Sequence, residues 1–579
     1  MTQIPNPTTL HHKRNSTTYC NVLLIALFLF APLYFQPNLG GRGLELTYNI
    51  PVWAIASFLI GGGLYLIAST QQFIRPMHTW AFLAFPVVIV LSGIINGSSQ
   101  PTPWLFRQIY VIGGLLFLFT LFQFNIKQNQ IERILYVIAA SALVNALIAI
   151  IQILSPELIQ GWLVTGGNTP IGVFQQINVL SSYLATGITI SFYLISRPSI
   201  TSVTLAAKAL LITCIGSSAF IITYIGSRSG MLSAVIGILI ILISRQKQLK
   251  KRAALTLIAL LSLAGGAIPG GIIEDGFKKL SQKTMEAAKG ADFSARVNMY
   301  AVALELIIQK PGTGHGIGNF QRAWGLQTGD YHQRNPNAKL PPYVEHPHNE
   351  LAYWLIEGGI VSFAGIAIAV GAIVLVLIRC GPQRGGGYVA LLTPITLHAQ
   401  VEQPFYISSL HWFLWLFLIF LILRHHTTTS TVPLSLPATR LIKTVAILSC
   451  IGSSYFLLHS ARAQSDIYTY LTAKENNGPY LQVALNNLYF KSYAEQLAMR
   501  SLLHASIQSE KPDKVHYFAQ WGEQQININP ELKLFEDLIN AYTFLELEKE
   551  RCRIINTGTM MYPMNQPLKT IANTCDKPN

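Results

Sequence analysis

The stretch from Leu351 to Ile378 reads LAYWLIEGGIVSFAGIAIAVGAIVLVLI, and Glu357 is its only charged residue. A membrane span needs about 20 apolar residues, so this run can cross a bilayer even when it is tilted. The whole chain has the same character, because 51% of its residues are hydrophobic and only 12% are charged. A soluble domain carries about 25% charged residues. An ordinary soluble enzyme, a disordered chain and a disulfide scaffold are therefore excluded, and the apolar runs must be helices.

Charge divides the chain into membrane and extramembrane parts. Of its 41 basic and 26 acidic residues, 17 lie in 274–350 and 25 lie in 461–579. The net charge of +15 therefore does not describe a nucleic-acid-binding surface, and no nucleic-acid partner is expected. We expect an all-α polytopic membrane protein with four parts: N-terminal transmembrane helices (1–273), a large loop (274–350), C-terminal transmembrane helices (351–459) and a helical domain (460–579). The thirteen candidate spans are 19–36, 50–70, 79–96, 106–124, 131–154, 177–196, 203–225, 229–244, 253–273, 351–378, 388–406, 409–423 and 441–459.

Orientation follows from the basic residues of the short loops, because these are retained on the cytoplasmic side. With the N-terminus inside, seventeen of them are cytoplasmic and only Arg42, Arg107 and Arg228 lie outside. The 274–350 loop and the 460–579 domain then face the periplasm of a bacterial inner membrane. The first apolar run, Tyr19–Phe35, follows basic residues as in a signal peptide. It lacks a small-residue cleavage site, which favours an uncleaved span.

The cysteines give one structural expectation. Cys552 and Cys575 both lie in the outer tail, which is an oxidising compartment in this orientation. These two cysteines could form a disulfide there, or they could remain as two unpaired thiols. The sequence has no Cys-x-x-Cys pair, so it does not support a zinc or redox site of that type.

Two arginines are candidates for binding an anion. Arg228 lies in GSRSG at 226–230, at the outer end of two spans. An arginine there is costly unless it has a function, although it could also snorkel to the interface. Arg296 follows Ser294, a residue suited to cap a helix. An arginine in a first helical turn is disfavoured unless an anion is present, and the alternative is a solvated loop arginine. Arg107 is a third candidate.

Two motifs occupy the end of the large loop. PGTGHGIGNF at 311–320 does not have the G-x-G-x-x-G spacing and has no βαβ context, so we expect a tight, glycine-permitted turn rather than a nucleotide site. EHPHNEL at 345–351 stands directly before a span. His346 and His348 could form an acid–base pair, bind a metal or cap the following helix. A neutral imidazole suits general-base work, whereas the ligand set for zinc is thin.

A further cluster, HAQVEQPFY at 398–406, lies in the predicted span 388–406. His398 and Glu402 are four residues apart, which places them on one face of a helix. Buried His and Glu side chains can form a proton relay, so a proton-coupled transporter is an alternative function. The sequence shows neither an internal repeat nor paired broken helices, which argues against a transporter.

In their order along the chain, GSRSG, Arg296, the glycine-rich motif and HPHNEL at 346–351 resemble the O-antigen ligase (Wzy_C) superfamily of GT-C glycosyltransferases. FQQIN at 174–178, the His398–Pro404 stretch and the helical tail look like its PglL branch, the protein O-oligosaccharyltransferases. The resemblance covers roughly 170–425 well and the tail loosely. One departure is Gln403, where that branch usually has a tyrosine.

The resemblance implies an inverting, metal-independent transfer of an oligosaccharide en bloc from undecaprenyl diphosphate to Ser or Thr of a periplasmic protein such as pilin. The bilayer, the lipid-linked donor and this acceptor would be the partners, and no cofactor is needed. His348 would be the catalytic base, and Pro347 would turn the ring of His346 away from it, so that His346 orients or packs. The other implied site residues are Arg228, Arg296 and Arg107 at the diphosphate, with Gln176, Asn178, His398 and Glu402 nearby. The alternative acceptors are lipid A core, as in O-antigen ligases, and a growing glycan, as in Wzy polymerases.

The orientation predicts the activity of alkaline phosphatase fusions, because this enzyme folds only after export. A fusion after residue 579 should be active in bacterial cells, and a fusion after residue 250 should be inactive. Phosphatase activity of both fusions, normalised to the amount of protein, checks this expectation. An inactive fusion at 579 or an active one at 250 would contradict the orientation.

Overall fold

The computed structural model of the chain describes residues 7–97, 100–159, 169–273, 278, 291–341, 344–426, 429–473 and 478–575. About 80% of the chain is helical, which confirms the expected all-α polytopic class. The chain divides into two compact units. The first unit is Met1–Leu83, Tyr110–Ser281 and Ile368–Tyr468, and the second unit is Ala84–Ile109, Gln282–Ala367 and Thr469–Asn579.

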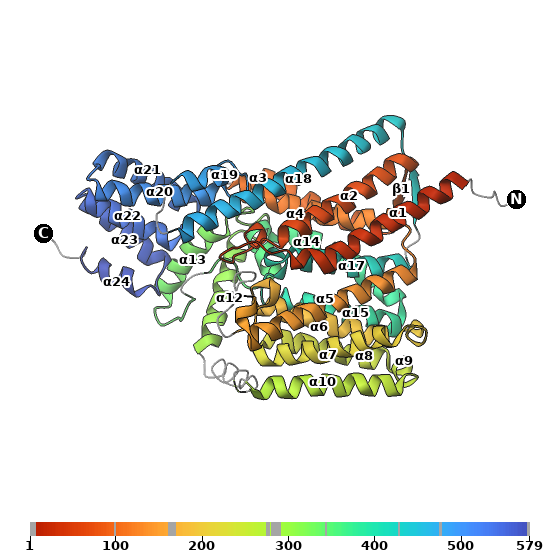
Figure 1. The fold of residues 1–579 in the computed structure, drawn as a ribbon. Helices are drawn as coiled ribbons and strands as arrows, with labels where there is room; N and C mark the ends of the chain where they lie inside the picture. The colour runs from red at the N-terminus through yellow and green to blue at the C-terminus, as the bar shows by residue number, and fades with distance from the viewer. Residues whose placement is uncertain are drawn as a thin grey trace. The chain divides into compact units, whose positions relative to one another are not determined.

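Most helices lie entirely within either the first or the second unit, and Figure 1 shows them. Those of the first unit are α1 (Pro7–Ile25), α2 (Asn49–Thr70), α5 (Gln128–Leu154), α6 (Ile177–Ile195), α7 (Leu205–Ile225), α8 (Arg228–Ser244), α9 (Gln246–Lys250), α10 (Ala253–Ile273), α15 (Gly381–His398), α16 (Pro404–Ile407) and α17 (Ser409–His426). Those of the second unit are α12 (Ala291–Gln309), α13 (Phe320–Arg334), α19 (Gln482–Leu485), α20 (Lys491–Gln508), α21 (Pro512–Ile528), α22 (Leu532–Phe544), α23 (Glu548–Met561) and α24 (Gln566–Ala572).

Four helices run from one unit into the other: α3 (Thr79–Asn96), α4 (Pro101–Gln123), α14 (Glu350–Arg379) and α18 (Leu436–Thr472). Short π or 3-10 turns are η1 (Ala26–Phe30), η2 (Ala31–Leu33), η3 (Gly43–Glu45), η4 (Pro156–Leu158), η5 (Gly172–Phe174), η6 (Pro198–Thr201) and η7 (Gly478–Leu481). Strands β1 (Gln72–Arg75) and β2 (Ser430–Pro433) pair antiparallel, with Gln72 opposite Pro433.

The described residues contain ten helices that are long and apolar enough to cross a membrane, and the shorter apolar helices α8 and α17 match the two short predicted spans. The one remaining predicted span, 388–406, is wrong as a continuous helix. Helix α15 ends at His398, and α16 begins only at Pro404. Proline lacks the N–H that a helix interior needs, and it disfavours helical dihedrals at the residue before it. The span was predicted from the number of consecutive apolar residues, which does not reveal this interruption.

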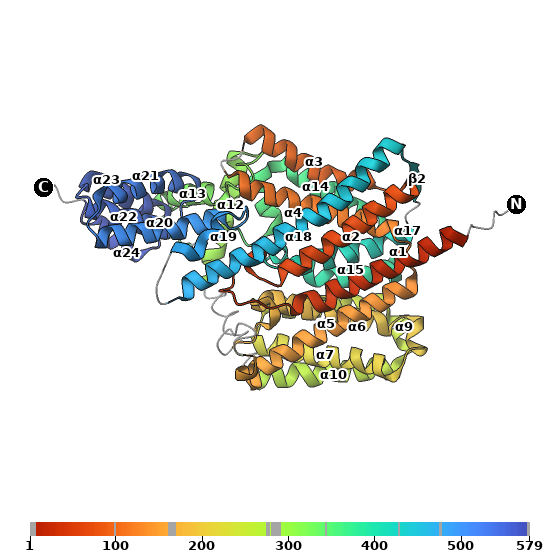
Figure 2. The same ribbon diagram turned by 45° about the horizontal axis from the view of Figure 1, so that its top comes forward.

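In the first unit, α6 is enclosed by α5, α7, α8 and α15. Figures 1 and 2 show α7 and α10 side by side, in agreement with their extensive contact. Gly266 of α10 lies so close to α7 that a Cβ atom would collide with the backbone of Gly216. Inside a bilayer such small residues let two helices approach and gain packing contacts, since the hydrophobic effect does not drive helices together there.

The tail of the second unit is helical, as expected. Successive helices from α20 to α24 pack on one another around a core that includes Phe518 and Phe535. Cys552 and Cys575 form a disulfide, so the alternative of two free thiols is wrong. The amphipathic pattern of residues 481–490 predicts one helix, and this prediction is wrong. Only α19 is α-helical within that run, because the Asn487 side chain accepts the N–H groups of Tyr489 and Phe490 in a turn before α20.

Candidate functional site

The arginine turn of the first unit connects α7 to α8. Gly226 ends α7 in the left-handed conformation, with φ of 64°. The Ser227 hydroxyl then accepts the N–H of Gly230 at 3.1 Å, so Ser227 caps α8 and Arg228 is its first residue. The free N–H groups and dipole of a helix start are positive. Adding a guanidinium there is unfavourable without an anion, so Arg228 and the α8 start together suit a phosphate.

Asn178 fixes this turn. Its side-chain oxygen accepts the hydroxyls of Ser227 at 2.9 Å and Ser229 at 3.3 Å, one on each side of Arg228. Gln176, two residues earlier, caps α6 by accepting the N–H of Val179 at 2.7 Å. The FQQIN stretch therefore contacts the GSRSG stretch. Two motifs that belong to one site would have to be in contact in this way. Gln176 acts on the start of α6, whereas Asn178 acts directly on the arginine turn.

His398 and Glu402 do not share a helix face, which corrects the expectation from their spacing. Because α15 ends at His398, Glu402 lies in the following turn, where its N–H and that of Val401 both bond to the His398 carbonyl. The buried His398 Nδ1 lies 2.8 Å from the Ser182 hydroxyl. The same hydroxyl is 3.2 Å from His411 Nε2, so His398 belongs to a buried Ser–His network.

The His346–His348 turn of the second unit precedes α14. Asn349 caps α14 by accepting the N–H of Ala352 at 2.9 Å, so the suggestion that a histidine is the cap is wrong. His348 has φ of 49°, a left-handed conformation that costs a non-glycine residue about 1–3 kcal/mol and is typical of functional sites. Its backbone N–H donates to His346 Nδ1 at 3.2 Å.

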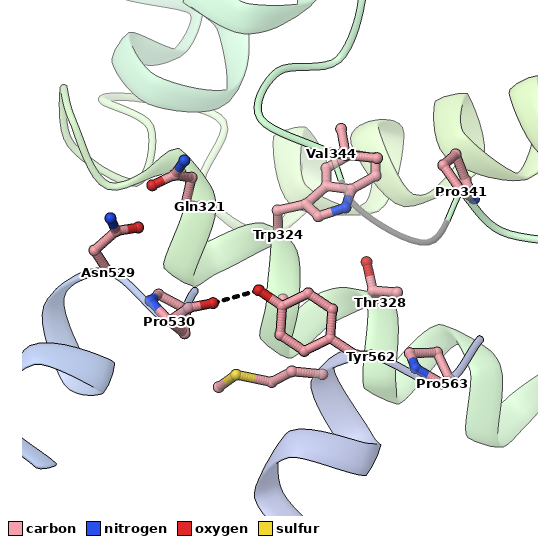
Figure 3. A pocket seen from close by; sticks show the side chains of 11 residues that line it. Gln321, Trp324, Thr328, Pro341, Val344, Asn529, Pro530, Tyr562 and Pro563 are labelled. Carbon is pink, nitrogen blue, oxygen red and sulfur yellow. Dashed lines mark hydrogen bonds between the residues drawn. The ribbon is translucent and has the colours of Figure 1, made fainter. Parts of the chain in front are cut away.

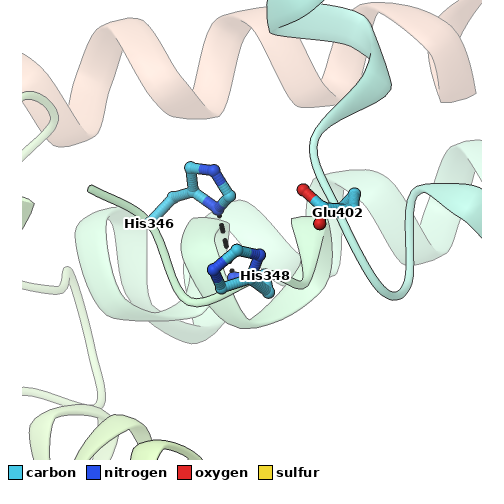
Figure 4. Close-up of side chains that lie close together, drawn as sticks. All are labelled: His346, His348 and Glu402. Atoms are coloured by element: carbon cyan, nitrogen blue, oxygen red, sulfur yellow. Dashed lines mark hydrogen bonds between the residues drawn. The ribbon is translucent and has the colours of Figure 1, made fainter. Parts of the chain in front are cut away.

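The two imidazole rings are in edge-to-face contact, with centroids 4.4 Å apart and planes at 63° (Figure 4). The expectation that Pro347 turns them in different directions is therefore wrong, because the positive φ of His348 folds the turn back on itself. His346 orients the backbone of His348 through the hydrogen bond between them. Glu402, also drawn in Figure 4, belongs to the first unit.

The glycine-rich motif forms the expected tight turn. Gly314, Gly316 and Gly318 have φ values of 74°, 94° and 92°, which side chains rarely adopt. His315 is half-buried, its Nε2 lies 2.9 Å from the Leu306 carbonyl, and burial lowers its pKa. A lowered pKa keeps this imidazole neutral at neutral pH, which suits a structural contact.

This turn completes the hydrogen bonds of a broken helix. At Gly359 the backbone of α14 leaves helical geometry, with φ of 62° and ψ of −168°. Instead of bonding to each other, the backbone groups on either side of the break bond to the turn. The carbonyls of Ile356 and Glu357 accept the N–H groups of His315 at 2.8 Å and Gly316 at 2.9 Å, and the N–H groups of Ile360 and Val361 bond to the carbonyls of Pro311 at 2.8 Å and Gly312 at 3.3 Å.

Glu357, next to the break, is fully buried and was not predicted as a site residue. One of its oxygens accepts the N–H groups of Gly318 at 3.0 Å and Phe320 at 3.2 Å, and the other pairs with Arg107. The Arg107 guanidinium also lies 4.1 Å from the centre of the Tyr353 ring. The structure thus gives Arg107 a carboxylate as an anionic partner. The signal in the sequence was the position of Glu357 as the only charge in a long apolar run.

Arg296 lies on α12 with an exposed side chain. Helix α12 already includes Ala291, so Ser294 lies within the helix, and the expectation that it is the N-cap is wrong. Arg296 is therefore beyond the first turn, and the helix dipole gives no argument for an anion there. Arg296 therefore remains a candidate for binding an anion only because it is positively charged and exposed.

The pair formed by Arg107 and Glu357 yields a stability prediction. Arg107→Met leaves a buried carboxylate without its cation, so we expect stability to fall by about 3–5 kcal/mol. Arg107→Met combined with Glu357→Gln should recover most of this, because the neutral amide oxygen still accepts both N–H groups. Thermal unfolding in detergent measures the difference. Arg334→Met, which breaks an exposed ion pair with Glu305, is the control and should leave the unfolding temperature nearly unchanged. Equal losses in the single and double variants would contradict the pairing.

Two family models match the chain. The O-antigen ligase model, Wzy_C, matches residues 209–367, which include Arg228, Arg296, the glycine-rich turn and both histidines of the His346–His348 turn. The model described as virulence factor membrane-bound polymerase, C-terminal, matches residues 388–573, which include His398, Glu402 and most of the tail. No curated protein matches the chain. With its apolar helices, the chain is a multi-pass membrane protein, and its residues 209–367 and 388–573 match two families consistent with the O-antigen ligase superfamily, whose members act on lipid-linked glycans and acceptors in the membrane.

Proposed function

We propose that this protein is an inverting glycosyltransferase that moves a preassembled oligosaccharide from undecaprenyl diphosphate to a Ser or Thr hydroxyl of a periplasmic, pilin-like protein. The observation that carries the proposal is the His346–His348 turn. It presents an imidazole from a strained backbone at the start of α14, in a chain of the O-antigen ligase superfamily. A hydroxyl is a poor nucleophile at neutral pH and needs a base in this kind of position.

The reaction follows from the chemistry of the two groups. His348 takes the proton of the acceptor hydroxyl while its oxygen bonds to the anomeric carbon of the first sugar. The bond from that carbon to the diphosphate oxygen breaks on the opposite face, which inverts the anomeric centre. Negative charge grows on the departing lipid diphosphate. Arg228, backed by the α8 start, and Arg296 neutralise this charge, and no metal is required.

Arg107 has a different role in this proposal. Its guanidinium is paired with Glu357 and packed on Tyr353, so it joins α4 to α14 and neutralises the carboxylate that bonds to the glycine-rich turn. Asn178 likewise acts through another residue, because it fixes the turn that carries Arg228.

The proposed acceptor and the proposed compartment are both inferred from the tail. The second unit ends in a helical domain with a disulfide, and disulfides persist in oxidising compartments such as the periplasm. A domain of this size outside the membrane offers a surface on which an acceptor protein can dock. Together with the loop charges, it supports an inner-membrane protein whose active site faces the periplasm.

A glycan polymerase is the second candidate, favoured by the match of residues 388–573 to a membrane-bound polymerase model. In that case the acceptor hydroxyl belongs to a growing lipid-linked glycan. Transfer to lipid A core is a third possibility within the superfamily. The transporter alternative loses its main support, since His398 and Glu402 do not share a helix face.

One experiment separates these acceptors. The protein is co-expressed with a pilin and a lipid-linked oligosaccharide, and the pilin is examined by intact mass. A pilin heavier by one glycan supports the proposal. An unmodified pilin overturns it. A ladder of longer lipid-linked glycans would identify a polymerase, and glycan on lipid A core would identify an O-antigen ligase.

The histidine pair predicts an unequal effect of substitution. His348→Ala should lower the rate about 10²–10⁴-fold, which is the usual contribution of a general base. His346→Ala should lose less, because it removes only the acceptor that orients His348. His346→Asn should be milder still, since the Asn side chain places an oxygen where Nδ1 accepts the hydrogen bond. Initial rates with saturating donor measure these effects. Activity lost with EDTA and restored by a divalent ion would make the histidines metal ligands and refute this mechanism.

The diphosphate role predicts the behaviour of the arginines. Arg228→Ala and Arg296→Ala should each strongly reduce transfer while the protein stays folded. Lysine at either position should rescue poorly, because an ammonium cannot bind diphosphate bidentately. Arg440→Ala, at an exposed arginine of α18, is the matched control and should transfer normally. Full activity of both alanine variants in the same assay would remove the arginines from the mechanism.

A further inference from the structure

Four arginines of the first unit lie at the opposite end of its helices from the Arg228 turn, and we call them the arginine cluster. Arg197 follows α6, Arg245 follows α8, Arg384 lies in the first turn of α15 and Arg424 lies in the last turn of α17. These helices are neighbours, because α15 contacts α6, α8 and α17. Arg197 and Arg384 are both close enough to Arg245 to repel its charge. Like charges that gather in this way need counter-charges nearby.

One carboxylate serves the cluster among the residues that the structure describes. Glu132 of α5 pairs with Arg197 at 2.9 Å. The Gln128 side chain donates to Glu132 at 3.3 Å, and its oxygen accepts from Arg424 at 3.4 Å. No described carboxylate forms an ion pair with any of the other three arginines. The cluster therefore has three more positive than negative side chains.

Arg245 is the most enclosed member of the cluster, with 6% of the residue exposed. Its Nε donates to the Ser196 hydroxyl at 3.0 Å, and a terminal nitrogen donates to the Ser196 carbonyl at 3.4 Å. Its guanidinium lies 5.8 Å from the centre of the Tyr193 ring. All of these partners are neutral, whereas a buried charge normally has a counter-charge.

Two general effects do not account for this excess of charge. A helix C-terminus carries about half a negative charge, so the ends of α6, α8 and α17 together offset at most about half of the excess. The preference of basic residues for cytoplasmic loops explains the side of the membrane on which they lie. It does not explain why one of them is buried among neutral groups.

A water molecule cannot supply what the cluster lacks. In the second unit, the Thr328 hydroxyl has no hydrogen-bond partner among the described residues, and the small space beside it (Figure 3) has room for about one water. A water satisfies a hydroxyl of this kind. Several guanidinium groups need an anion instead, and phosphate matches their planar fork of donors.

The surroundings of the cluster indicate where such a phosphate comes from. One face of α8 carries four exposed apolar side chains at helical spacing, Leu232, Val235, Leu239 and Ile243. In a membrane protein this face contacts acyl chains, and it ends two residues before Arg245. Three exposed lysines follow directly, Lys247, Lys250 and Lys251. An acyl chain along α8 therefore ends where the basic residues begin.

We propose that the arginine cluster binds the phosphate headgroup of an anionic phospholipid. Basic pockets between the ends of membrane helices bind such lipids, and cardiolipin offers the largest counter-charge because it carries two phosphates. The inference does not depend on the proposed transfer. The same four helices carry Asn178, Arg228, His398 and His411 at their other ends, so a bound lipid would hold together the helices that position these residues.

Native mass spectrometry of the detergent-solubilised full-length protein tests the site. Cardiolipin or zwitterionic phosphatidylethanolamine is added at equal concentration, and the bound lipid is identified from the mass of the complex. We expect cardiolipin to bind more tightly. Arg384→Gln should weaken its binding about fivefold, the effect of one basic residue near a lipid headgroup. This arginine is exposed, so the variant should fold normally.

Two further variants make the test specific. Arg245→Gln should also weaken cardiolipin binding, and its unfolding temperature without added lipid shows whether it folds. Arg440→Gln is the matched control. Arg440 is an exposed arginine near the start of α18, which the loop charges place on the same side of the membrane, and it is not among the residues that repel Arg245. Its variant should bind cardiolipin as the wild type does.

The outcomes are distinct. Cardiolipin binding that Arg384→Gln and Arg245→Gln weaken, and that Arg440→Gln does not, supports the site. If Arg245→Gln does not fold, Arg384→Gln alone decides against the same control. Equal effects of all three variants, or no preference for cardiolipin, overturn the proposal. Inorganic pyrophosphate that displaces cardiolipin at equal concentration would also overturn it, since the ligand would then be a soluble anion. No glycan donor or acceptor is present, so the result is independent of the proposed transfer.

Discussion

A carboxylate enclosed in an apolar helix must be paired, and Glu357 shows what this requirement can organise. Its partners come from two other segments, Arg107 of α4 and the pair Gly318 and Phe320 where the glycine-rich turn joins α13, so that with α14 three segments meet at this carboxylate. Burying a charge is costly unless hydrogen bonds and a counter-charge surround it. One side chain therefore fixes the relative positions of three segments that are far apart in the sequence.

The break at Gly359 explains why the glycine-rich turn and α14 behave as one assembly. An intact helix would use its own N–H groups to satisfy the carbonyls of Ile356 and Glu357, but here the turn does so. The same helix starts at Glu350 and is capped by Asn349, directly after His348 with its positive φ. About two turns after His348, backbone hydrogen bonds join α14 to the glycine-rich turn. The glycine-rich turn and the His346–His348 turn are separate in sequence, but both are attached to α14.

The sequence was sufficient wherever composition or local conformation decides the structure. The all-α class, twelve of the thirteen apolar helices, the helical tail and the glycine turn follow from hydropathy and from the φ values that only glycine adopts readily. Prediction from the sequence failed where the local structure depends on contacts between residues far apart in the chain. Ser294 can cap a helix but lies inside one, and Pro404 interrupts an apolar run. Glu357 stood out as a lone charge, yet its partner lies 250 residues earlier in the chain.

Stability does not explain why an ion pair occupies this position. Well-packed apolar residues often replace a buried pair at no cost in stability. Apolar residues here would leave the N–H groups of Gly318 and Phe320 without their acceptor, and the glycine-rich turn could then take other conformations. In the observed arrangement, the turn satisfies one oxygen of Glu357 and makes the four backbone bonds at the helix break, while Arg107 satisfies the other oxygen. We infer that the buried pair selects this geometry of the glycine-rich turn against α14, whose start is fixed separately by the Asn349 cap next to His348.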